Sequence, residues 1–298
     1  MDELPQRVAG RNPVLWTALL LAGSFTLLYG RVLARLVHDW INDGNYSHGF
    51  LIVPLSLYFA WERRARLRTI QRDPSAFGLV VVIGSLAVLL AGLMGAELFL
   101  TRVSIVGIVA GSILFLFGWR TLGLLALPVL FLLLMIPIPA IILNQVTFPL
   151  QLLASQVGES ALRGLGVPVL REGNVIVLAN VSLEVAEACS GIRSLISLLT
   201  LGIVYGYFAD SRFSVRFVVA LCTIPIAIAS NGLRVAGTGI AAHYFGPRAA
   251  EGFFHTFSGW LMFVVAFCML FVVTRLIIRV APRPAWGVLP DSIVAVRS

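Results

Sequence analysis

The stretch Glu187-Ala-Cys-Ser-Gly-Ile-Arg-Ser194 joins a polar segment to a long apolar run. Of the three cysteines, only Cys189 lies at such a junction, because Cys222 and Cys268 fall inside apolar runs, where a thiol is usually a small buried hydrophobe. The two residues after Cys189 favour the start of a helix, and Arg193 follows one turn later. A helix N-terminus beside a guanidinium favours the nucleophilic thiolate. The alternative is a plain helix cap with an idle thiol beside it.

The composition around this stretch is that of a polytopic membrane protein. The chain has 298 residues, of which 59% are hydrophobic and 12% charged, a balance that would leave a soluble domain with large exposed apolar patches. Three cysteines do not make a disulfide framework. All 22 basic residues are arginine, so neither a lysine Schiff base nor a lysine general base is available. We expect one integral membrane domain over 1–298, with no metal and no cofactor.

Apolar runs predict about eight membrane-spanning helices, since roughly 20 helical residues cross the hydrocarbon core of a bilayer. The runs lie at about 14–33, 47–61, 76–95, 98–118, 121–142, 191–209, 216–239 and 256–278. The second run is the shortest, and the count of eight depends on it. The expected fold is an all-α polytopic membrane protein.

Arginine placement predicts the orientation of these helices. Five arginines crowd the loop after the second run, between Arg63 and Arg72, which makes that loop cytoplasmic. Alternation then places both termini inside, with a cytoplasmic tail at about 280–298. Inside segments total 14 basic and 6 acidic residues, whereas outside segments hold 8 of each. The net charge of +8 is therefore a topology signal, and nucleic-acid binding is excluded as its explanation.

The largest external insertion spans about 143–189. Ile136-Pro-Ile-Pro139, just before it, is expected to kink or end a helix. Pro149 is expected in the first turn of an amphipathic helix that lies in the membrane interface. Alternating valines and leucines over 175–185 predict a β-hairpin whose second strand leads to Cys189. Such a hairpin suits strand addition by an extended peptide, or it is only a lid.

Two more residues with catalytic chemistry fall on the same side of the membrane as Cys189. Asn231, Arg234 and Thr238 share one helical face near the outer end of the run at 216–239. An arginine inside an apolar run is a candidate for function, with snorkelling to the interface as the alternative. His255 begins the last run. His48, in the polar loop before the second run, is either a helix-end anchor or a further site residue.

Cysteine as nucleophile, histidine as proton carrier and arginine as charge stabiliser are the groups that acyl transfer through a thioester requires. We expect Cys189, Arg234 and His255 in these roles. Arg193, Asn231 and His48 are expected to bind or orient the substrate. Arg234 either holds a substrate carboxylate or stabilises the oxyanion, and the sequence does not separate the two.

Four segments resemble the exosortase/archaeosortase family of membrane cysteine transpeptidases. Three resemble its signature blocks: Ala188-Cys-Ser-Gly-Ile-Arg-Ser194, Asn231-Gly-Leu-Arg234 and Phe254-His255. The early Tyr46-Ser-His-Gly-Phe50 is similar to the bacterial members. The resemblance extends over nearly the whole chain. It implies a cysteine transpeptidase or peptidase of the bacterial inner membrane, with its active site at the periplasmic face.

The same resemblance implies the partners. Substrates would be exported proteins with a C-terminal sorting tail, composed of a Pro-Glu-Pro motif, one transmembrane helix and a basic end. The enzyme would cleave near the motif and pass the acyl group to an envelope acceptor that the sequence does not identify. Such bacteria often produce exopolysaccharide.

Two other functions compete with the transpeptidase. A non-enzymatic transporter or polysaccharide-assembly component would use the polar faces of 191–209 and 216–239 as a path, although the inner halves of both runs are apolar. A hydrolytic protease would differ only in using water as the acceptor.

Overall fold

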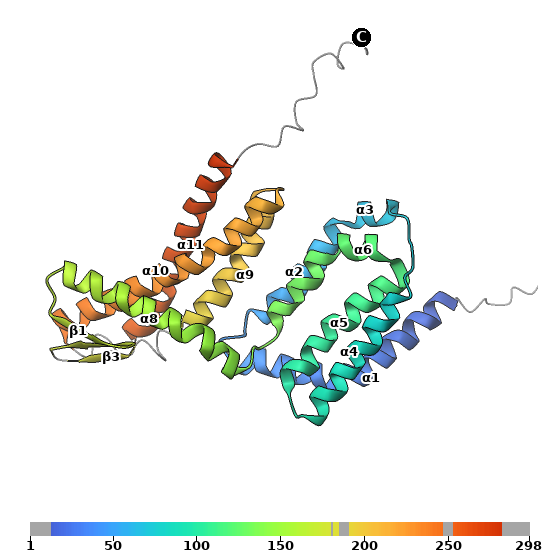
Figure 1. Cartoon of the computed structure of the whole chain (residues 1–298), viewed down its shortest axis with the longest axis horizontal. Helices are drawn as coiled ribbons and strands as arrows, with labels where there is room; N and C mark the ends of the chain where they lie inside the picture. The colour runs from blue at the N-terminus through green and yellow to red at the C-terminus, as the bar shows by residue number, and fades with distance from the viewer. Residues whose placement is uncertain (1–12, 180, 185–190, 247–252, 282–298) are drawn as a thin grey trace, which may run out of the picture. The chain divides into compact units, whose positions relative to one another are not determined.

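The computed structural model describes residues 13–179, 181–184, 191–246 and 253–281, and within these ranges it describes the side chains outside 13–21, 184, 191–194 and 253–258. The protein is mostly helical (81%) and carries a small three-stranded sheet (Figure 1). Contacts divide the chain into two compact units, Met1–Pro139 and Ala140–Ser298. The single membrane domain over 1–298 stays a prediction, and the cytoplasmic tail lies almost wholly outside the described residues.

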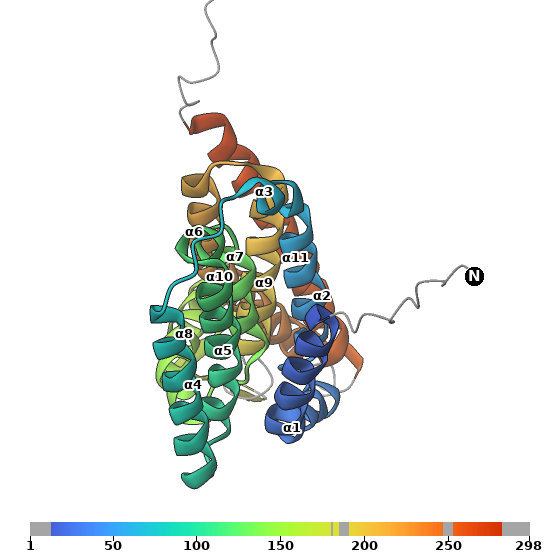
Figure 2. The same ribbon diagram turned by 90° about the vertical axis from the view of Figure 1, so that its right-hand side faces the viewer.

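The first unit is built from helices alone in its described part. They are α1 (Pro13–Asn42), α2 (Gly49–Glu62), α3 (Arg64–Thr69), α4 (Phe77–Met94), α5 (Leu98–Phe117), α6 (Trp119–Leu124), α7 (Ala126–Phe131) and the 3-10 helix η1 (Leu132–Met135). Helices α4 and α5 lie side by side (Figure 2). They pack closely because Gly111 brings the α5 backbone against Val82 of α4, where an added Cβ would lie 2.9 Å from Val82.

The proline segment ends a helix, as predicted. Helix η1 stops at Met135, and Ile136 is extended. Pro139 has no N–H to donate to the Met135 carbonyl four residues earlier. The Trp40 indole takes that place and donates from Nε1 to Met135 O over 2.9 Å. Gly49 makes room for this bond, because a Cβ there would collide with the Trp40 ring.

A buried ion pair joins α1 to α5. Arg102 Nη2 donates to Asp39 Oδ2 over 2.5 Å, and the Arg102 side chain is only 3% exposed. A charge this far from water requires a close opposite charge. One face of α1 is thereby fixed to the first turns of α5. Tyr29 adds a second contact between the same helices, since its hydroxyl lies 3.1 Å from Ser104 Oγ.

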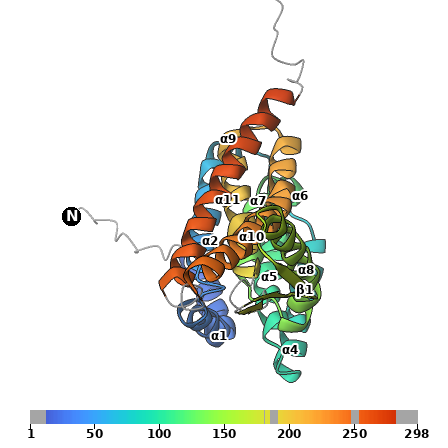
Figure 3. The same ribbon diagram turned by 90° about the vertical axis from the view of Figure 1, so that its left-hand side faces the viewer.

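The second unit combines long helices with the sheet. Its elements are α8 (Ala140–Gly164), β1 (Val169–Glu172), β2 (Val175–Leu178), β3 (Ser182–Glu184), α9 (Gly191–Ala209), α10 (Phe213–Phe245) and α11 (Phe253–Val280). Helices α9, α10 and α11 pack on one another (Figure 3).

The sheet contains the predicted hairpin and one further strand. Strands β2 and β3 pair antiparallel, which confirms the hairpin over its described part. Strand β1 also pairs antiparallel with β2 and was not predicted. Glu172 pairs with Val175, so the turn is Gly173-Asn174, with Gly173 at φ +65°. Gly-Asn between two strands is a known hairpin signal that could have revealed β1.

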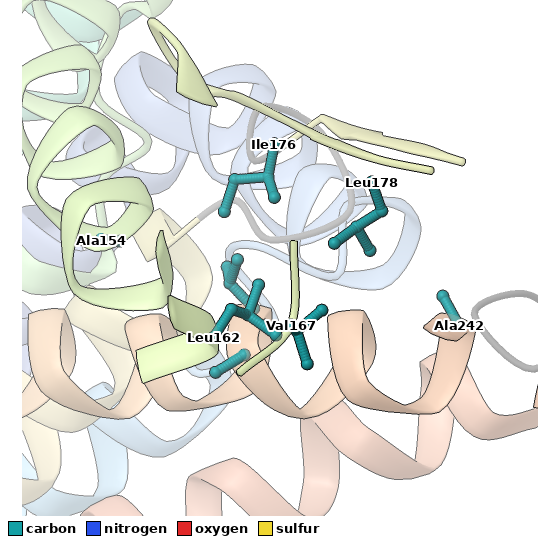
Figure 4. Packing of buried hydrophobic residues seen from close by; sticks show 8 residues of the cluster. Ala154, Leu162, Val167, Ile176, Leu178 and Ala242 are labelled. Carbon is teal, nitrogen blue, oxygen red and sulfur yellow. The ribbon is translucent and has the colours of Figure 1, made fainter. Parts of the chain in front are cut away.

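The sheet, α8 and α10 share one apolar core (Figure 4). Its buried residues are Ala154, Leu162, Val167, Ile176, Leu178, Val235, Ala236 and Ala242. Glycines allow the two helices to approach closely. A Cβ at Gly232 of α10 would lie 2.5 Å from Val157, and one at Gly158 of α8 would lie 2.7 Å from Val235. The insertion is therefore fixed to the helix that carries Arg234.

One sequence expectation differs from the structure, and the expected number of membrane spans is not confirmed. Pro149 lies inside α8 rather than in its first turn, because the apolar residues that follow Pro139 start the helix at once. Among the described residues, five helices are long and apolar enough to cross a membrane: α4, α5, α8, α10 and the Gly259–Val280 part of α11. Three shorter apolar helices cover Gly49–Glu62, Ala126–Met135 and Leu195–Ala209. The expected run at 121–142 is divided by the proline segment, and the eight-span layout stays a prediction.

Candidate active site

The ends of α9, α10 and α11 are tied together at one end of the second unit. Arg212, in the short turn between α9 and α10, donates from Nη1 to the carbonyl of Ala281, just after α11, over 3.0 Å. Arg212 also forms two hydrogen bonds to the carboxylate of Asp210 through Nε and Nη2, at 2.9 and 2.7 Å. The guanidinium of Arg212 lowers the pKa of Asp210. The bond between Arg212 and Ala281 places these two residues side by side, so positions along α10 and α11 can be compared by counting residues from them.

Arg234 and Gly259 lie equally far along their helices from this joined pair of residues. Each is 22 residues from its tied position, Arg212 or Ala281. At 1.5 Å per residue this is about 33 Å along each helix. A Cβ on Gly259 would lie 3.8 Å from Arg234 Nη2. The guanidinium of Arg234 therefore rests against α11 at Gly259, one helical turn beyond His255.

A hydrogen bond between α10 and α11 fixes this pairing. Ser230, one turn before Arg234, is buried and donates from Oγ to the Met262 carbonyl over 3.0 Å. Met262 follows Gly259 by three residues and lies on the same side of α11. A shift of one helix along the other would break this bond inside an apolar region, where its loss costs about 1–3 kcal/mol. The register of Arg234 against the start of α11 is thus set by a neighbouring contact.

Arg234 borders a cavity between α9, α10 and α11. The cavity measures about 330 Å³, counting its open mouth, and is lined by Leu198, Ala227, Ser230, Asn231, Arg234, Gly259, Met262, Phe263 and Ala266. Three of these residues are polar, all on α10, and the other lining residues that the structure describes are apolar. A guanidinium beside an apolar wall attracts negative charge more strongly than one in water. The cavity is chemically suited to a developing oxyanion or a carboxylate.

Asn231 also borders a second cavity, between α8, α9 and α10. This cavity measures about 310 Å³ on the same basis and is lined by Thr147, Leu150, Gln151, Leu195, Ala227, Ile228 and Asn231. Ala227 and Asn231 belong to both linings. The two cavities are therefore neighbours along α10. Thr147 and Gln151 are polar lining residues that the sequence analysis did not select, because this segment was expected to hold an amphipathic helix lying in the membrane interface.

Two of the predicted site residues are described only in part, and a third is not described at all. Cys189 lies outside the described residues, between the end of β3 at Glu184 and the start of α9 at Gly191. For Arg193 and His255 the backbone alone is described, in the first turns of α9 and α11. The structure therefore describes the arginine of the expected triad in full. For the histidine it describes only the helix, α11, on which the residue lies.

His48 belongs to the first unit and supports its proline segment. Its Nε2 lies 3.1 Å from the carbonyl of Leu134, which only accepts, so this nitrogen carries the proton. Tyr46 binds the same segment through a bond from its hydroxyl to Ile138 O at 3.3 Å. Burial lowers the pKa of His48. These contacts are structural, and a role for His48 in orienting a substrate stays a prediction.

The fold is that of a helical membrane protein, and Arg234 lines one of its cavities. The family model described as transmembrane exosortase (Exosortase_EpsH) matches residues 40–272, and the chain belongs to that family. The matched range contains His48, Cys189, Arg234 and His255. No curated protein and no solved structure matches the chain.

Proposed function

We propose that this exosortase-family protein is a membrane cysteine transpeptidase that cleaves a C-terminal sorting tail of exported proteins. Membership of the family supports this assignment. The observation that carries it is the position of Arg234, whose guanidinium lies against α11 one turn from His255 and borders a cavity shared with α9. Helix α9 begins two residues after Cys189. A nucleophile, a base and a cation would then meet at one end of three packed helices.

In the proposed reaction, the Cys189 thiolate attacks the carbonyl carbon of the scissile peptide bond, after His255 has taken the thiol proton. Arg234 stabilises the negative charge on the carbonyl oxygen. The C–N bond then breaks, and His255 returns the proton to the departing amine, which leaves a thioester on Cys189. An acceptor amine attacks this thioester, restores the thiol and carries the exported protein away.

The proposed setting is the bacterial inner membrane, with both termini cytoplasmic and the site at the periplasmic face. The excess of arginine in the predicted inside loops supports this orientation. The proposed substrates carry a Pro-Glu-Pro motif followed by one transmembrane helix and a basic end, and production of exopolysaccharide accompanies their sorting. Arg193 and Asn231 are proposed to orient the substrate.

Trapping of the thioester tests the proposal. The full-length protein, in nanodiscs, is mixed with a tail peptide and quenched in acid, and intact-mass spectrometry then seeks an acyl adduct that hydroxylamine removes. We expect the adduct in the wild type and in Cys222→Ala, and none in Cys189→Ala. Sorting that continues in Cys189→Ala would overturn the nucleophile assignment and favour the non-enzymatic transport or assembly function.

The mass of the released product separates transfer from hydrolysis. Transpeptidation adds the mass of the acceptor amine to the new C-terminus, whereas a protease leaves a free carboxylate there. We expect the acceptor mass when membranes of the producing cell are present.

A further inference from the structure

The cavity between α8, α9 and α10 has an unusual polar content for an apolar setting. Its lining brings together two carboxamides, Gln151 and Asn231, and the hydroxyl of Thr147, which is 4% exposed. The other lining residues are aliphatic, and none of the lining residues that the structure describes has an ionisable side chain. A charged ligand would find no counter-charge among these described side chains. The lining suits a neutral ligand that both donates and accepts hydrogen bonds.

A peptide backbone is such a ligand. Each carboxamide offers donors and an acceptor, as does each peptide unit. Peptide groups that enter an apolar region must find partners, because each unsatisfied group costs several kcal/mol. The first four N–H groups of a helix have no partner within that helix. Side-chain oxygens at the entrance to the membrane would satisfy them.

The cavity also lies in the correct direction from Arg234. Ala227, Asn231 and Arg234 follow one another along α10, and the first two line the cavity. Arg234 is seven residues beyond Ala227, which is about 10 Å along the helix and corresponds to about three residues of extended peptide. The cavity therefore lies on the side of Arg234 that faces the tied ends of α9, α10 and α11. A transmembrane tail must extend in that direction if it is to cross the bilayer.

We infer that this cavity binds the backbone of the departing tail, one to three residues beyond the scissile bond, and that Gln151 is a substrate-binding residue. The inference rests on the proposed function, since it takes the substrate to be a peptide with a membrane tail. Gln151 and Asn231 already interact within the protein, so tail binding exchanges those interactions for bonds to peptide groups. Binding of this part of the tail then depends more on its free backbone N–H and C=O groups than on its side chains.

Binding to the full-length Cys189→Ala protein in nanodiscs tests this inference without catalysis. A fluorescent tail peptide is titrated by anisotropy. Adding Gln151→Leu, which keeps the size of the side chain and removes its hydrogen bonds, should raise Kd about tenfold. Gln156→Leu is the matched control, because Gln156 is exposed on the same helix, and it should leave Kd unchanged.

A modified peptide makes the test independent of any folding defect. N-methylation of the amides one to three residues after the scissile bond should weaken binding to the Cys189→Ala protein that keeps Gln151 about tenfold. The same N-methylation should have little effect once Gln151 is leucine. Equal losses in the two proteins, or no loss in either, would overturn the inference.

The outcomes for the two proposals can be told apart. Cys189-dependent acylation together with wild-type binding by Gln151→Leu overturns only the role of the cavity. Gln151-dependent binding without any acylation of the wild type overturns only the transpeptidase. Absence of tail binding by the Cys189→Ala protein overturns the inference, whatever the acylation result.

Discussion

Arg234 lies beside a glycine of the neighbouring helix. Its guanidinium lies over Gly259, where a Cβ would be 3.8 Å from Nη2, an ordinary van der Waals distance. A methyl group at this position would fit in contact with the guanidinium. Ser230 supports the same arrangement from α10 through its bond to Met262. Packing between α10 and α11 therefore contributes to the position of this cation.

Two substitutions at Gly259 should behave differently for this reason. Gly259→Ala adds the methyl group that fits, and we expect thioester formation within about threefold of the wild type. Gly259→Leu pushes the guanidinium aside, and a displacement of about 1 Å in a catalytic group can cost about 100-fold in rate. Single-turnover acylation of Cys189 measures both. Equal rates for the two variants would contradict the position proposed for Arg234 in catalysis.

His48 should make the stability of the protein depend on pH. Burial lowers the pKa of His48 below its ordinary value of 6.5, so between these two values the unfolded chain binds more protons than the folded one. The free energy of unfolding should therefore fall as the pH drops from about 6.5 towards the folded pKa. His48→Gln removes this titration while its amide still donates to Leu134.

Denaturant titrations in micelles at several pH values measure this effect. The loss of stability on acidification should be smaller in His48→Gln than in the wild type. His38→Gln is the control, since the side chain of His38 is 74% exposed. An identical pH dependence in the wild type and His48→Gln would show that His48 does not contribute.

At the scale of elements, α8 and α10 are held together by close backbone approach. Gly158 and Gly232 lie at the contact, and Val157 and Val235 fill the space opposite them. Without a strong hydrophobic force inside a bilayer, small residues at the contact let van der Waals packing hold two helices together. This packing positions Gln151 beside Asn231.

Gly232→Ala should loosen this pair of helices. The new Cβ would lie 2.5 Å from Val157, and overpacking of this kind costs about 1–3 kcal/mol. We expect lower thermal stability and weaker tail binding. Gly237→Ala, on the same helix with nothing within 4 Å, is the control and should be neutral or stabilise by about 0.5–1 kcal/mol. If the two variants lose equal stability, contact with α8 is not the cause.

At the scale of the whole molecule, the proposed orientation can be tested through the second unit alone. The turn Gly173-Asn174 belongs to the sheet, and Asp210 to the turn that ties α9, α10 and α11. The proposal places the first outside and the second inside, which follows from the arginine bias.

Cysteine labelling checks this orientation. In a protein whose own cysteines are replaced by alanine, Asn174→Cys should react with an impermeant maleimide in spheroplasts. Ser211→Cys should react only after the membrane is opened. The reverse pattern would overturn the periplasmic placement of the site.

The sequence by itself determined the helical membrane class, the helix end at the proline segment, the β2–β3 hairpin and the family. These follow from local properties: apolar run length, the missing N–H of proline, alternation over 175–183 and short motifs. It also selected Arg234, because a charge inside an apolar run is conspicuous. Asn231 was selected because it shares a helical face with Arg234.

Only the tertiary structure decided what lies beside these residues. It placed Gly259 under the Arg234 guanidinium, joined Gln151 to Asn231 across one cavity, and assigned Trp40 to the carbonyl that Pro139 leaves free. It also extended α8 back to Ala140. The three contacts join residues 25 to 95 positions apart, and their existence depends on how helices pack, which no local pattern encodes.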